Sequence, residues 1–77
     1  MDNLFLSSLN IGEGGVIDKV ITSNLKIKRR LLELGFVSGT RVSVLSRSSL
    51  GEVILVEIIG YCISIRKSLA NYIILKK

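Results

Sequence analysis

The residues from 29 to 41, RRLLELGFVSGTR, hold the end of a helical pattern, two glycines and the start of a strand. Ile27, Leu31 and Leu34 are spaced i, i+4 and i+7, which places them on one side of a helix. Gly35 follows directly, and glycine most easily takes the left-handed conformation in which helices commonly end. The stretch therefore predicts a helix-to-strand corner around which the rest of a small fold is arranged.

The chain beyond this glycine should turn twice before it becomes extended. We expect Phe36 and Val37 to turn inward as the chain leaves the helix. Gly39-Thr40 then supplies a second turn. Residues 41–47 alternate in polarity well enough to predict a strand that begins at Arg41.

The remaining elements are short and mostly extended. Thr22-Ser23-Asn24 supplies an N-cap for a helix over residues 25–34, because their side-chain oxygens can accept the free amides of the first turn. The other predicted elements are an N-terminal arm with a turn near Ser7–Leu9, a flexible turn at 12–15, strands at 16–21, 53–59, 61–65 and 72–75, a hairpin loop at 48–52, a tight turn at Gly60 and a helical turn at 66–71. Five short strands with one helix inserted after the first predict a mainly β fold, a small and partly open barrel.

Size and composition favour one domain, residues 1–77, with an aliphatic core. Hydrophobic residues make up 48% of the 77 residues and aromatic residues only 5%. A domain of this size is expected to be stable by about 4–12 kcal/mol. The mean hydropathy of +0.53 is high for a soluble chain and indicates more apolar surface than one small core can bury.

The sequence indicates a cytoplasmic protein. Its longest aliphatic run, Val53–Val56, is far shorter than the roughly 20 residues of a spanning helix, and we see no signal peptide at the start. The single cysteine, Cys62, cannot form an internal disulfide. The net charge of +5 permits binding to nucleic acid, anionic lipid or an acidic partner.

Enzymatic and metal chemistry are not expected. The chain has no histidine, one cysteine and six scattered acidic residues, so we predict no catalytic residue, no metal site and no cofactor. Cys62 has no histidine to activate it, and we interpret it as a small core residue on an interior strand.

The strand over residues 53–59 carries more apolar surface than one core face needs. Its even-numbered residues form one face, and on the odd-numbered face only Glu57 is polar. Either the strand is covered on both sides within the domain, or the second face docks on a partner or on another copy. A five-stranded barrel has little to cover an outer face, which favours docking. The candidate contact residues on or beside this face are Leu45, Leu50, Val53, Leu55 and Ile59.

The helix carries two features with open interpretations. Leu25 and Leu32 form a second apolar stripe, so either the helix is sandwiched or Leu32, a further candidate contact, meets something outside the domain. The basic cluster Lys26-Lys28-Arg29-Arg30 is either a solvated face or a contact for phosphate or an acidic protein. Proteins that bind nucleic acid usually add exposed aromatic residues on which the bases stack. This chain has only four aromatic residues, which argues against nucleic acid as the partner of the basic cluster.

The order and spacing of these residues resemble FeoA-domain proteins, the SH3-like barrels of bacterial ferrous iron uptake. The resemblance covers nearly the whole chain, and its most specific part runs from Arg30-Leu31-Leu32-Glu33-Leu34-Gly35-Phe36 to Gly39-Thr40-Arg41-Val42. The family often has proline at the position of Ser38 and in the loop 48–52, where this chain has none. These are loop positions, so the departures affect loop shape and partner contact.

The resemblance implies a small cytosolic accessory protein of the membrane transporter FeoB, which carries a cytoplasmic GTP-binding domain. It would regulate the GTPase, act as a scaffold for the transporter, or both. The alternative function is that of a small barrel that binds nucleic acid. Self-association through the apolar strand face is compatible with the role at the transporter. We interpret the family motif as structural, with functional contacts on the outer strand face. Its structural residues are Leu31, Leu34, Gly35, Gly39 and Val42.

Overall fold

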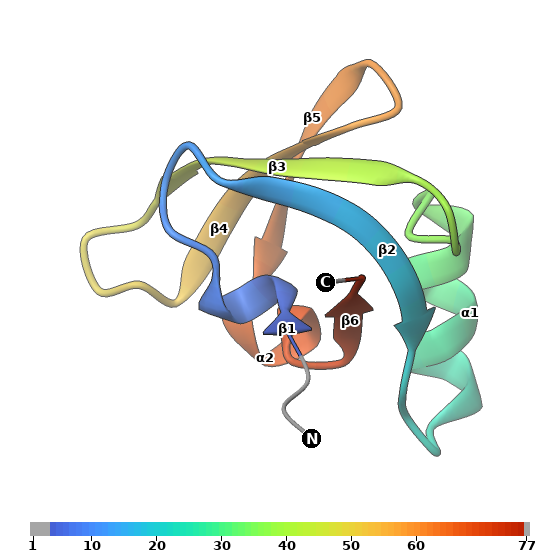
Figure 1. Ribbon diagram of the computed structural model, residues 1–77. Helices are drawn as coiled ribbons and strands as arrows, with labels where there is room; N and C mark the ends of the chain where they lie inside the picture. Colours follow the sequence, from blue (N-terminus) through green and yellow to red (C-terminus); the bar gives the residue numbers. More distant parts are fainter. Residues whose placement is uncertain (1–3, 77) are drawn as a thin grey trace.

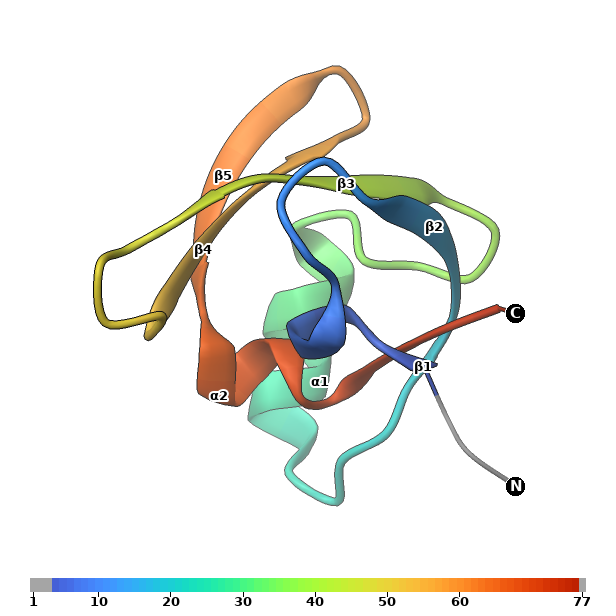
Figure 2. The same ribbon diagram turned by 60° about the vertical axis from the view of Figure 1, so that its left-hand side comes forward.

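The computed structural model describes residues 4–76, which form one curled antiparallel sheet with helices beside it (Figures 1 and 2). The sheet order is β1-β6-β2-β3-β4-β5, so β1 and β5 are its edges. The elements in chain order are β1 (Leu4–Phe5), the 3-10 helix η1 (Leu6–Ser8), β2 (Gly14–Val20), α1 (Leu25–Glu33), β3 (Arg41–Arg47), β4 (Val53–Ile58), β5 (Tyr61–Arg66), α2 (Lys67–Ala70) and β6 (Ile73–Leu75). None of the helices in this range is long and apolar enough to cross a membrane.

The predicted mainly β barrel with one inserted helix and a short C-terminal helical turn is confirmed, with one addition. The N-terminal arm supplies a sixth strand, because Leu4 and Phe5 pair with Leu75 and Ile74 of β6. A two-residue strand has no periodicity to reveal it in the sequence. The pairing exists only because β6, at the other end of the chain, offers its free edge.

The start of β2 corrects the flexible turn expected at residues 12–15. Gly14 and Gly15 already pair with Ser43 and Val42 of β3. A Cβ atom on Gly14 would lie 2.8 Å from the carbonyl oxygen of Val42, closer than real Cβ atoms come. Glycine is therefore present here because β2 and β3 approach closely, and only the preceding residues form the turn.

Helix α1 begins and ends as the sequence predicts. The Asn24 side-chain oxygen accepts hydrogen bonds from the amides of Lys26 (3.0 Å) and Ile27 (3.2 Å), which makes Asn24 the N-cap. At the other end Gly35 has φ +107°, and the amides of Gly35 and Phe36 donate to the carbonyls of Leu32 and Leu31. This pair of bonds is the Schellman motif, in which a left-handed residue satisfies the last helical carbonyls.

The residues that follow the end of α1 agree with the prediction only in part. Phe36 is fully buried, as expected, but Val37 is exposed. The carbonyl of Val37 accepts the amide of Thr40 at 3.1 Å, so Val37 opens the next turn and its side chain points away from the core. Gly39 lies in that turn with φ +91°.

The core lies inside the curl of the sheet and is almost entirely aliphatic. It is made by one face of each long strand and by single residues of the helices, with Leu31 from α1, Leu6 from η1 and Ala70 from α2. Leu34 is only partly buried and packs against this cluster. The core includes Ile17, Phe36, Val42, Val44, Ile54, Val56, Ile58, Ile73 and Leu75, all fully or almost fully buried.

Candidate partner-binding surface

The outer face of β4 carries the apolar side chains that the core does not use. Val53 and Glu57 are exposed and Leu55 is partly exposed, whereas the alternating residues between them are buried. The face is therefore open to solvent, and the interpretation of a strand covered on both sides within the domain is wrong. Within residues 4–76 the sheet curls around a single core, and no other element covers the outside of β4.

The neighbours of β4 make this apolar strip narrow. Leu55 pairs with Ser46 of β3 on one side and with Ser64 of β5 on the other, and Val53 pairs with Arg66. Directly paired residues project to the same face of a sheet. The outer surface is thus a short apolar strip bordered by two hydroxyl groups and one guanidinium group.

A β-bulge in β3 widens the strip. The register between β3 and β4 shifts between Val44 and Ser46, and Leu45 and Ser46 are both exposed. Such a bulge places two residues of one strand opposite a single residue of its partner. Leu45 therefore joins the outer surface beside Leu55 without displacing the serine.

The same bulge gives Arg47 a structural role that the sequence reasoning missed. Arg47 pairs with the buried Ile54, so it lies on the inner side of the sheet. Its guanidinium group donates to the carbonyl of Leu9 and, at 2.9 Å, to that of Ser7. The only signal in the sequence is the adjacent apolar pair Val44-Leu45, which breaks the period of two.

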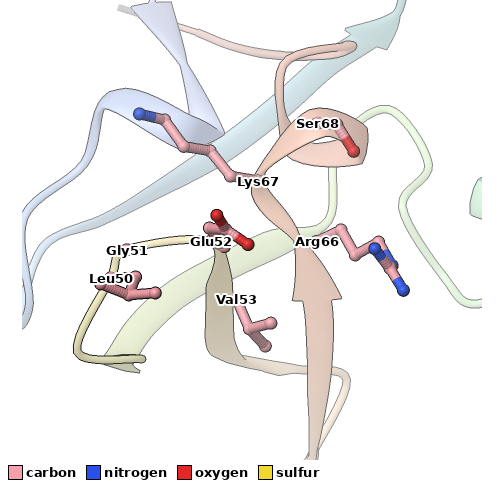
Figure 3. A pocket seen from close by; sticks show the side chains of 7 residues that line it. All are labelled: Leu50, Gly51, Glu52, Val53, Arg66, Lys67 and Ser68. Atoms are coloured by element: carbon pink, nitrogen blue, oxygen red, sulfur yellow. The ribbon is translucent and has the colours of Figure 1, made fainter.

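The β3–β4 loop extends the apolar strip beyond the end of β4. Leu50 is 84% exposed and lines a shallow depression of about 520 Å³ together with Val53, Arg66 and Lys67. Figure 3 shows the two basic side chains pointing in different directions from the rim, with the Glu52 carboxylate between them. The backbone amide of Lys67 donates to the carbonyl of Glu52 at 2.8 Å and ties the loop to α2.

The six predicted contact residues fall in three places. Leu45, Leu50, Val53 and Leu55 lie on and beside the outer face of β3 and β4, and we call these four residues the sheet patch. Ile59 and Leu32 lie outside it.

Ile59 lies in the β4–β5 turn with φ +50°, at the far end of β4 from Leu50. A Cβ on Gly35 would be 2.7 Å from the Cδ1 atom of Ile59, so this side chain folds over the end of α1. The Tyr61 hydroxyl donates to the Leu34 carbonyl at the same place. Leu32 projects from α1 and is 40% exposed.

The prediction that Cys62 is a core residue on an interior strand is wrong. Cys62 is exposed and pairs with Glu57 of the outer face. It lies on β5, which is an edge strand, and the pairing register places it outside the sheet. The run of apolar residues around it gave no indication of which face would be buried.

Helix α1 is not sandwiched, because both residues of its second apolar stripe are exposed. Leu25 is 75% exposed, and all four residues of the basic cluster are exposed as well. Within residues 4–76, no group of three or more histidine, cysteine, aspartate or glutamate side chains is placed to hold a metal ion.

The sheet patch and the basic residues at its rim, Arg66 and Lys67, can recognise an apolar side chain next to a carboxylate by contact alone.

Comparison with known proteins identifies a family whose model matches almost the whole chain. A model of the FeoA domain matches residues 5–77. FeoA of Stenotrophomonas maltophilia in complex with zinc is 32% identical, with a TM-score of 0.82 over 95% of this chain and 89% of that one. It is described as a prokaryotic SH3-domain protein and a candidate ferrous iron transport activating factor. A FeoA-like protein from Clostridium acetobutylicum is 24% identical, with a TM-score of 0.89 over 99% of this chain and 87% of that one.

The same fold also occurs inside a longer protein. A manganese-dependent transcriptional repressor in complex with manganese matches this chain with a TM-score of 0.88. The match covers 99% of this chain and 37% of the repressor. At 19% identity this likeness concerns the fold alone. No curated protein sequence matches the chain.

Proposed function

Because the chain belongs to the FeoA domain family, we propose that it is an accessory protein of bacterial ferrous iron uptake that acts by protein–protein contact. Its partner is the FeoB transporter, and the contact is made on the cytoplasmic side, where that transporter carries its GTP-binding domain. The description of the S. maltophilia relative as a candidate transport activating factor supports this role. The role requires no catalytic group and no resident cofactor in this chain.

The observation that carries the proposal is the exposed sheet patch. Leu50, Val53 and Leu45 are large apolar side chains on adjoining strands and their loop, and each is at least 39% exposed. Burying an apolar side chain of this size in an interface contributes about 1.5–3 kcal/mol. Arg66 and Lys67 beside it would pair with carboxylates of the partner and orient the contact.

The direct experiment is a calorimetric titration of the purified cytoplasmic GTPase domain of the cognate transporter with this protein, in the presence of GTP and of GDP. We expect binding of micromolar affinity or better that differs between the two nucleotides. The variant Val53→Thr/Leu55→Thr places a β-branched residue, which strands favour, at both positions, so the fold should survive. It should bind at least about ten-fold more weakly, because two apolar contacts are lost.

Leu25→Ser is the matched control, since Leu25 is also an exposed leucine but lies on α1. It should bind the GTPase domain like the original protein. Equal binding by the double strand variant would contradict the assignment of the sheet patch. Absence of binding in both nucleotide states would contradict the choice of partner domain.

Two alternatives predict different results with the same protein. A second copy on the sheet patch would give a mass that falls on dilution, and the strand variant would then be monomeric at every concentration. A nucleic-acid-binding barrel would bind single-stranded or duplex oligonucleotides at low salt, with an affinity that falls steeply as salt is added. The absence of any such binding would dispose of that alternative.

A further inference from the structure

Helix α1 combines exposed leucines with most of the net positive charge of the molecule. The helix LKIKRRLLE contains four basic residues and one acidic residue, which gives +3 of the net +5 of the chain. Leu25 is 75% and Leu32 is 40% exposed, while Leu31, about 100° around the helix from Leu32, is fully buried. The core therefore needs only one side of this helix, and neither leucine of the outer side contributes to it.

The arrangement of these side chains follows from helix geometry. Lys28 and Arg29 are each three or four residues from both Leu25 and Leu32, so these four side chains are neighbours. All four line one open depression of about 440 Å³ together with Glu33. The two leucines are about 10 Å apart along the helix. We call Leu25, Lys28, Arg29 and Leu32 the helix patch.

We propose that the helix patch binds the anionic phospholipid headgroups of a membrane surface. Cationic side chains pair with the lipid phosphates, and the leucines insert at the boundary between headgroups and acyl chains. Helix α1 would lie in the plane of the interface, held by both contacts. This inference rests on the proposed function, because a transporter in the same membrane gives the contact its purpose.

A lipid surface fits the helix patch better than the other anionic partners. Single-stranded nucleic acids are usually held by aromatic stacking, and α1 contains no aromatic residue. A polyphosphate chain also gains nothing from the exposed Leu25. An acidic protein segment would meet Glu33 within the same depression. Glu33 disfavours a lipid phosphate too, but a fluid headgroup layer can rearrange around one carboxylate, and a fixed protein surface cannot.

The positions of the two patches allow both contacts at once. In Figure 1 the β3–β4 loop with Leu50 lies at the left of the molecule and α1 at the right. The molecule extends 29 Å along its longest axis. Lipid bound at α1 would therefore leave the sheet patch free, and attachment to the membrane would raise the concentration of the protein near a membrane-bound partner.

The test is cosedimentation of the full chain with vesicles, without any transporter present. We expect binding to vesicles of phosphatidylglycerol mixed with phosphatidylcholine, little binding to pure phosphatidylcholine, and a loss of binding as salt is added. A basic residue at an anionic surface contributes about a five-fold factor in affinity, so Lys28→Gln/Arg29→Gln should bind about 30-fold more weakly. Leu25→Ser should bind about five-fold more weakly.

The matched control, Lys19→Gln/Lys76→Gln, removes the same charge from exposed residues outside α1 and outside the sheet patch, and should change vesicle binding little. An equal loss with this control would overturn the proposal, because only the net charge would then matter. Equal binding to anionic and neutral vesicles would overturn it as well.

The titration with the soluble GTPase domain separates this proposal from the proposed function. If the lipid contact is right, Lys28→Gln/Arg29→Gln loses vesicle binding and keeps binding to the GTPase domain. If the variant keeps vesicle binding and loses the protein partner, the helix patch is a protein contact and the lipid proposal is overturned. Binding to an oligonucleotide through the same two residues, without vesicle binding, would also overturn it.

Discussion

The two faces of β4 are both mainly apolar, but they lie in different environments. The inner residues Ile54, Val56 and Ile58 are at most 1% exposed. On the outer face Val53 is 39% exposed, and Leu55 is partly exposed and pairs with a serine on each side. The comparison teaches that apolar composition alone does not identify a core strand. What separates the faces is the curl of the sheet, which encloses one face and leaves the other to solvent or to a partner.

The largest loss of stability is expected from a substitution on the inner face of β4. Ile54→Ala removes a fully buried side chain and leaves a cavity, so the free energy of unfolding should fall by about 2–5 kcal/mol. Val53→Ala, one residue away on the outer face, should cost less than about 1 kcal/mol. Urea denaturation of both variants measures the difference. Similar losses for the two would mean that the outer face is covered in the free protein, for instance by a second copy.

An intermediate loss of stability is expected when Arg47, a polar residue on the inner side of the sheet, is replaced. Arg47→Met keeps most of the apolar stem and removes the hydrogen bonds to the carbonyls of Ser7 and Leu9, at a cost of about 1–3 kcal/mol. Amide hydrogen exchange should rise most in η1 and β1, because Arg47 holds the arm that contains them. Arg41→Met, at an exposed position of the same strand, is the control and should change neither quantity. Unchanged exchange in the arm would show that β1–β6 pairing holds it without Arg47.

The smallest effect is expected at Cys62 on the outer face of β5. Cys62→Ser should change the free energy of unfolding by less than about 0.5 kcal/mol, because the side chain is exposed. A thiol reagent should also label Cys62 in the folded protein as completely as in urea. Labelling that requires unfolding would show that the outer face of β5 is covered in solution.

Local chemistry explains which parts of the fold were predictable. An N-cap within Thr22-Ser23-Asn24 and Gly35 as the left-handed end of α1 depend on interactions within a few residues, and both predictions are confirmed, with Asn24 as the capping residue. The bounds of β3 are those predicted, and β4 ends one residue before the prediction, at Ile58. Ile59 instead enters the turn with a positive φ and covers the end of α1.

The errors concern contacts between distant segments. The sixth strand depends on β6 meeting the N-terminal arm. The close approach of β2 and β3 makes Gly14 part of a strand, and the register of β5 on β4 places Cys62 on the outer face. The candidate contacts show the same limit. The sequence indicated surplus apolar residues, and the structure separates four of them from Ile59 and Leu32.

The sequence by itself determined most of the elements, their order, the long helix α1 and the family, because hydrophobic period, capping and glycine turns act over a few residues. Only the tertiary structure decided which face of each strand is enclosed, that a bulge turns Arg47 inward, and that the sheet patch and the helix patch lie at different ends of the molecule. These features depend on strand register and sheet curvature. Both are set by contacts between residues far apart in the chain, and no local pattern records them.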